Sequence, residues 1–194
     1  MTPRLGPLPE RLIDPAPAVR AGGFAAAAVG LEWARVLVAR QPELALAALV
    51  LGGVALGALG LRFRARDLGL SRSALGFKLA GGVALGVVLL LPALARRHPG
   101  PPLPVAFALA AITVSIGEEI AFRGALFAAI QTWLGPLPAI VGSSLVFTAG
   151  HVLSHPPEFL LPVAAAGVLL ATWRWACRDL VAPIVAHCIA DLAL

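Results

Sequence analysis

Two adjacent carboxylates and a guanidinium lie inside one long apolar stretch of this chain. They are Glu118, Glu119 and Arg123, and the apolar run around them extends from Val105 to Leu134. A charged side chain at membrane depth is costly and persists where it is paired or faces a polar cavity. A Glu-Glu-x-x-x-Arg pattern in such a run therefore predicts a functional site.

The spacing within this cluster predicts which of its charges pair. Glu119 and Arg123 are four residues apart with the acid nearer the N-terminus, the better order for an ion pair on one helix face. Glu118 points about 100° away around the same helix. We therefore expect Glu119 and Arg123 to form a supporting ion pair, and Glu118 to lack a cationic partner.

Three further polar side chains, His151, His187 and Asp191, lie in later apolar runs. Gly135-Pro136 predicts a turn between two antiparallel helices. Glu118 lies 17 residues before Gly135 and His151 lies 16 residues after it, so the two side chains are expected at the same depth. His187 and Asp191 are four residues apart and are expected on one helix face.

These residue types point to hydrolysis of a carbonyl compound. A carboxylate beside an imidazole in a low-dielectric pocket can act as a general base, so Glu118 and His151 are candidates to activate a water. His187 and Asp191 are candidates to polarise the carbonyl and stabilise the oxyanion. A zinc site made by Glu118, His151 and His187 is the alternative. The chain has no His-Glu-x-x-His helix motif, and the spacing leaves both interpretations open.

The remaining polar groups are interpreted as structural. Glu32 and Arg35 are three residues apart and are expected to pair with each other on a helix face. Five residues are expected at the surface or at the membrane interface: His98, His155, Arg174, Arg178 and Asp179.

The composition identifies the class of protein. Of 194 residues, 59% are hydrophobic and 13% are charged, whereas a soluble domain has about 25% charged residues. The net charge of +5 comes from basic residues in short breaks between apolar runs, which is typical of membrane loops and does not indicate a nucleic-acid partner. Two cysteines, Cys177 and Cys188, are expected as free thiols in apolar surroundings. Abundant Ala, Leu, Gly and Arg with a single Lys suggest a bacterial source.

The apolar runs predict an all-α, polytopic transmembrane helical bundle of six or seven helices, depending on whether the first run spans the bilayer or lies at its interface. A polar, proline-interrupted lead occupies residues 1–20. The predicted helices are 22–39, 42–61, 76–95, 105–134, 137–153, 159–175 and 180–194. The fourth is too long for one perpendicular span, and Gly117 and Gly124 are where we expect it to bend.

The basic residues also predict an orientation. With the segment 62–78 in the cytoplasm, the inner segments contain ten Lys and Arg residues and the outer ones three. His151 then lies a few residues from the outer loop 154–158, so the site is expected nearer the outer face.

The polar motifs resemble those of the CAAX-protease and bacteriocin-processing family of intramembrane proteases, also called the type II CAAX prenyl endopeptidase family. That family's signature is Glu-Glu-x-x-x-Arg, then Phe-x-x-x-His, then His-x-x-x-Asn or Asp. This chain has Glu118-Glu119-x-x-x-Arg123, Phe147-x-x-x-His151 and His187-x-x-x-Asp191, in that order.

The resemblance implies a catalytic core at 104–194, preceded by variable membrane helices at 21–103. It implies that Glu118 and His151 activate the water, that His187 and Asp191 form the oxyanion side, and that Glu119 and Arg123 support the site. We favour a glutamic-type mechanism without a metal or other cofactor. Asp191 stands where the eukaryotic prenyl-protein proteases have Asn. An Asp must be protonated, or must orient His187, to take the same role.

We therefore predict an intramembrane endopeptidase in a bacterial inner membrane, acting on a membrane protein or lipid-anchored peptide within the lipid bilayer. Removal of C-terminal sorting anchors from exported proteins is a candidate activity. Two alternatives remain from other classes. One is a non-catalytic membrane protein on the same fold, such as a bacteriocin-immunity factor or scaffold. The other is a proton-coupled carrier, which usually has inverted repeats that this sequence does not show.

Overall fold

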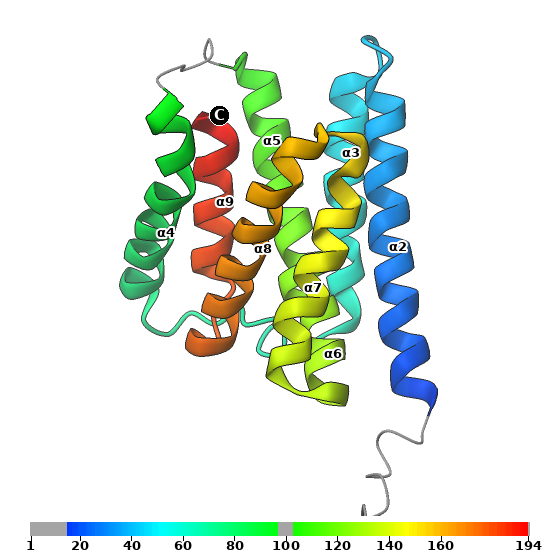
Figure 1. The fold of residues 1–194 in the computed structure, drawn as a ribbon, viewed down its shortest axis with the longest axis vertical. Helices are drawn as coiled ribbons and strands as arrows, with labels where there is room; N and C mark the ends of the chain where they lie inside the picture. Colours follow the sequence, from blue (N-terminus) through cyan, green and yellow to red (C-terminus); the bar gives the residue numbers. More distant parts are fainter. Residues whose placement is uncertain (1–14, 97–102, 194) are drawn as a thin grey trace, which may run out of the picture.

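The computed structural model describes residues 15–96 and 103–193, and within these it consists of helices and their connections. The helices stand side by side as a bundle (Figure 1). His98 and residues 1–14 of the predicted lead lie outside the described residues. The elements in chain order are α2 (Pro15–Ala39), α3 (Ala45–Ala58), η1 (Leu59–Arg62), α4 (Leu75–Arg96), α5 (Val105–Glu118), η2 (Glu119–Leu126), α6 (Phe127–Leu134), α7 (Pro136–Gly150), η3 (His151–Leu153), α8 (Pro157–Cys177) and α9 (Val181–Ala193).

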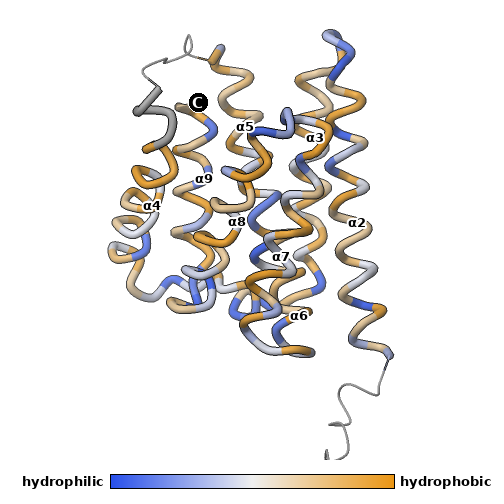
Figure 2. Tube along the Cα trace, viewed as in Figure 1, coloured by the Kyte–Doolittle hydropathy of each residue, from blue (hydrophilic) through white to orange (hydrophobic). Residues whose placement is uncertain are grey.

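The prediction of an all-α membrane bundle is confirmed. In the described part of the chain, five helical segments are long and apolar enough to cross a membrane, and Leu75–Leu91 and Val181–Ala193 are shorter apolar helices. Most of each helix carries apolar residues along its length (Figure 2). Large apolar side chains such as Leu51, Leu109 and Leu161 are exposed on the outside of the bundle, as expected where lipid replaces water.

The first predicted helix is part of the bundle. α2 starts at Pro15, seven residues before the predicted boundary, with proline at a position where its missing N–H costs nothing. Trp33 of α2 donates its indole N–H to the carbonyl oxygen of Ala149 in α7 at 3.0 Å. This contact joins α2 to the end of α7, immediately before His151.

The long predicted helix 105–134 is present but changes type in the middle. α5 continues into the π-helical segment η2, which begins at Glu119, and then into α6. The bend expected at Gly117 and Gly124 stays a prediction. Gly117 also has a packing role, because a Cβ built there would lie 2.1 Å from the carbonyl oxygen of Gly53. The backbones of α3 and α5 are thus in direct contact, as small residues allow between membrane helices.

The end of the bundle that contains the connection between α3 and α4 is closed by buried polar groups. Arg174 donates a hydrogen bond to the carbonyl oxygen of Asp67 at 2.8 Å. Asp179 accepts hydrogen bonds from the backbone N–H groups of Val181 and Ala182, which caps the start of α9, and its carboxylate lies 3.5 Å from Lys78 Nζ. Arg174 and Asp179, which were predicted as interface anchors, are buried under this connection, whereas Arg178 is exposed.

Candidate active site

Glu118, at the end of α5, faces two imidazoles. Its Oε2 atom lies 3.7 Å from Nε2 of His151 and 3.7 Å from Nε2 of His187. The depth match across the Gly135 turn thus brings Glu118 and His151 together as predicted, and α9 adds the second imidazole. All three side chains are buried.

His151 is oriented by the end of α7. Its Nδ1 lies 2.8 Å from the carbonyl oxygen of Phe147, one turn earlier on the same helix. A carbonyl can only accept, so Nδ1 carries a proton, and in the neutral ring Nε2 presents a lone pair toward Glu118. The His151 ring packs at 4.2 Å, centroid to centroid, from the Phe147 ring, which restricts its rotation.

His187 is held by carboxylates from two other positions in the bundle. Its Nδ1 lies 2.8 Å from Oε1 of Glu119, and its Nε2 lies 3.6 Å from Oδ2 of Asp191, one turn later on α9. Asp191 also accepts a hydrogen bond at 2.7 Å from the Ser115 hydroxyl on α5. Helix spacing does not predict that Ser115 lies beside Asp191, because the two residues are 76 positions apart.

The predicted ion pair between Glu119 and Arg123 is present. Arg123 Nη1 donates to Glu119 Oε1 at 2.9 Å, and neither side chain is exposed. The guanidinium carbon lies 3.8 Å from the centroid of the Phe147 ring, a cation–π contact that partly replaces water around the charge. Glu119 therefore connects Arg123 to His187 through a single oxygen.

The prediction that Glu118 lacks a cationic partner was wrong. Arg35 of α2 donates from Nη2 to Glu118 Oε1 at 3.0 Å. The same Nη2 contacts Glu32, so the predicted pair on α2 is present but extends into the site. The sequence did indicate that α2 contributes to the site, because Glu32 and Arg35 are charged side chains in an apolar helix, and such charges predict a functional site.

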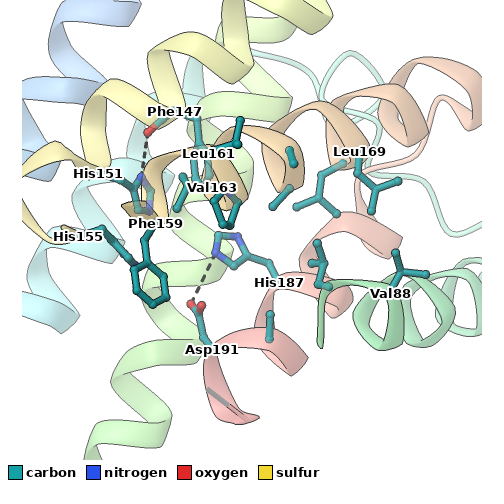
Figure 3. Close-up of a pocket in the computed structure, with 16 residues that line it drawn as sticks. Val88, Phe147, His151, His155, Phe159, Leu161, Val163, Leu169, His187 and Asp191 are labelled. Carbon is teal, nitrogen blue, oxygen red and sulfur yellow. Dashed lines mark hydrogen bonds and ion pairs between the residues drawn. The ribbon is translucent and has the colours of Figure 1, made fainter. Parts of the chain in front are cut away.

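An apolar cavity of about 490 Å³ opens beside these groups. It lies between α4, α8 and α9, with His151 and His155 at one end and Val88 and Leu169 at the other (Figure 3). The cavity wall is mostly aliphatic, and its polar groups are His151, His155, His187 and Asp191. This arrangement suits an apolar chain with one polar, reactive bond.

His155 was predicted at the surface, but it is half-buried and lines the cavity. Its ring lies 5.3 Å from the His151 ring, centroid to centroid, and its Nδ1 lies 2.9 Å from the Ser154 hydroxyl. Partial burial lowers the pKa of the His155 imidazole below its ordinary value, which favours the neutral ring at neutral pH.

The geometry gives no support to the zinc alternative. Among the described residues, no group of three His, Cys, Asp or Glu side chains is arranged to hold a metal ion. Glu118, one of the three predicted ligands, already carries the Arg35 guanidinium on Oε1, and that positive charge would repel a divalent cation on the same carboxylate.

Comparison with known proteins finds one family model that matches the second half of the chain. Residues 100–193 match the family model described as type II CAAX prenyl endopeptidase Rce1-like. No curated protein and no solved structure matches the chain. The matched region contains all three motifs and leaves out α2, α3 and α4. The resemblance predicted from the motifs is therefore confirmed over residues 100–193, where this multi-pass membrane protein matches the type II CAAX prenyl endopeptidase Rce1-like family.

Proposed function

We propose that this protein is an intramembrane endopeptidase that hydrolyses a peptide bond with a water activated by Glu118 and His151. The observation that carries the proposal is the 3.7 Å separation between Glu118 Oε2 and His151 Nε2 beside an apolar cavity. With His151 protonated at Nδ1, both facing atoms are acceptors, and 3.7 Å exceeds a direct hydrogen bond. A water between them can donate one O–H to each.

The chemical roles follow from this placement. Glu118 takes a proton from the water as its oxygen attacks the carbonyl carbon of the substrate, and a tetrahedral oxyanion forms. His187, protonated and held by Glu119 and Asp191, donates from Nε2 to that oxyanion. When the C–N bond breaks, Glu118 returns the proton to the leaving amine. One water is consumed, and a carboxyl group and an amine are released.

The substrate class follows from the cavity and from its place in the bilayer. The aliphatic wall formed by α4 and α8 suits the apolar residues next to the scissile bond of a membrane-anchored or membrane-proximal protein. The positive-inside bias of the sequence supports an orientation in which His151 and the cavity lie toward the outer face of the membrane, which we propose is a bacterial inner membrane. Removal of C-terminal sorting anchors from exported proteins is the activity that fits both features.

Replacement of Glu118 tests the hydrolase against the non-catalytic alternative. Glu118→Gln keeps the size of the side chain but removes the base, and we expect cleavage to fall by at least ~10²-fold, the usual contribution of a general base. Membrane proteomics of a deletion strain complemented with wild-type or variant protein measures the outcome. The same uncleaved precursor should accumulate with the empty vector and with Glu118→Gln.

The matched control is Glu158→Gln, the same change at an exposed position at the start of α8. It should restore cleavage fully. If Glu118→Gln complements the deletion as well as the wild type does, the protein acts without hydrolysis and the proposal is wrong.

A further inference from the structure

Arg35 is a buried cation that the catalytic roles above leave unused. It lies on α2, outside the region that matches the family, yet its side chain is only 9% exposed and meets the carboxylate of Glu118, which is 3% exposed. The two residues are separated by 83 positions in the chain. A buried cation is costly unless it has a partner, so its presence here needs an explanation from the site.

The bundle makes room for this side chain at two places. A Cβ on Gly52 of α3 would lie 2.6 Å from Arg35 Cδ, so only glycine leaves space for the aliphatic part of Arg35. A Cβ on Gly150 of α7 would lie 3.2 Å from Glu32 Cγ. Glu32 and Arg35 therefore enter between α3 and α7, and Trp33 fixes α2 to α7 through the Ala149 carbonyl.

We propose that Arg35 is a positioning residue for Glu118. Its Nη2 atom holds Oε1 of Glu118 at 3.0 Å, and this leaves Oε2 directed at both His151 and His187. Glu32 in turn contacts the same Nη2 and holds the guanidinium in place. On this basis the reaction centre is completed by α2 and is not contained in residues 100–193.

A carboxylate held at one oxygen loses rotational freedom about its last two bonds. Without Arg35, Oε2 can turn away from the water that it shares with His151. Small misplacements of a reacting group cost on the order of 10²-fold in rate, and this cost falls on the chemical step. Substrate binding in the cavity does not involve Arg35, because Arg35 is not among the cavity-lining residues.

The test rests on the proposed function and uses purified full-length protein in lipid nanodiscs with the precursor identified above. Arg35→Gln should lower kcat on the order of 10²-fold with KM unchanged. Arg35→Lys keeps the charge on a more flexible stem and should give an intermediate kcat. Arg20→Gln, the same change at an exposed position of α2, should keep both constants. If Arg35 had a purely structural role, Arg35→Lys would not partly restore kcat, and Arg35→Gln would also change KM.

A double-mutant cycle in thermal unfolding provides a second readout that needs no activity. Arg35→Gln and Glu118→Gln should each lower the unfolding temperature, and the double variant should lose less than the sum of the two. An unchanged kcat in Arg35→Gln, or a loss confined to KM, overturns the proposal, as does strict additivity in the cycle. If the wild type cleaves nothing while the cycle shows coupling, the proposed function fails and the contact between Arg35 and Glu118 stands.

Discussion

Arg123 lies between the Glu119 carboxylate and the face of the Phe147 ring, with none of its side chain exposed. Within the part of the chain that the structure describes, two of its nitrogen atoms, Nε and Nη2, have no hydrogen-bond partner. The Glu119 carboxylate is therefore the main compensation for a full positive charge inside the bundle. Removing one partner of a buried ion pair leaves the other charge uncompensated.

Glu119→Gln is expected to destabilise the protein more than most single substitutions do. The neutral amide leaves the charge of Arg123 without a counter-ion and weakens the contact that holds His187. The loss of one partner of a buried ion pair lowers the free energy of unfolding by about 3–5 kcal/mol. Thermal unfolding in detergent micelles measures this as a lower transition temperature. Glu158→Gln, at an exposed helix start, serves as the control and should unfold as the wild type does. A transition for Glu119→Gln within error of the control would contradict the structural role of the pair.

Local spacing predicted the contacts that lie within one helix or across one turn. Glu119 and Arg123 share a helix face, and Glu118 and His151 share a depth across a single hairpin, so both contacts follow from counting residues. The contact from Arg35 to Glu118 does not follow from counting residues. Glu32 already offered Arg35 an ion pair on the same helix, and helix spacing does not predict which helix α2 packs against. That choice depends on packing around Gly52 and Gly150.

At the scale of elements, the contact between α3 and α5 sets the position of Glu118. The two helices meet where Gly53 faces Gly117, one residue before Glu118. Backbones can approach this closely only where neither residue has a side chain. Any group added at this contact must push α3 and α5 apart, and Glu118 moves with α5.

Gly117→Ala is therefore expected to destabilise the bundle although alanine is the better helix former. Its Cβ would lie 2.1 Å from the Gly53 carbonyl oxygen, and overpacking of this kind costs about 1–3 kcal/mol. Gly22→Ala on α2 is the matched control, because a Cβ there meets no atom of the described residues within 4 Å, and the change should be neutral or slightly stabilising. Thermal unfolding of both variants tests the contact, and equal stabilities would show that α3 and α5 do not pack through these glycines.

Hydropathy predicted the helices within a few residues except at the start of α2, because lipid exposure demands long apolar runs with polar breaks. It did not predict the π-helical segment η2. Gly117 precedes the Glu-Glu motif and Gly124 follows it, and these glycines suggested a bend. Nothing in the residue pattern distinguishes a π turn from an α turn. The change of helix type at Glu119 depends on how α5 and α6 fit against their neighbours.

At the scale of the whole molecule, the connections sort to two ends of the bundle (Figure 1). One end has the connections between α2 and α3 and between α7 and α8. The other has the start of α2 and the connection between α3 and α4, which carries the arginines of the segment 62–72. The positive-inside rule predicts that this second end is cytoplasmic, and on that prediction His151 and His155 lie toward the outer side.

Cysteine labelling tests this orientation. After Cys177 and Cys188 are replaced by Ser, a Glu158→Cys variant should react with an impermeant thiol reagent added to intact cells, because Glu158 is exposed beside the outer connection. An Arg64→Cys variant, exposed on the opposite connection, should react only after lysis. The reverse pattern would place the cavity toward the cytoplasm.

The arrangement of Glu32 and Arg35 also bears on how the protein is made. α2 precedes α5 in the chain, so it reaches the translocation machinery before the residue that Arg35 finally contacts has been synthesised. A lone guanidinium in a nascent helix opposes its transfer into lipid. Glu32 lies one turn earlier on the same helix, so the part of α2 that follows Arg20 enters the bilayer with no net charge and later shares its cation with Glu118.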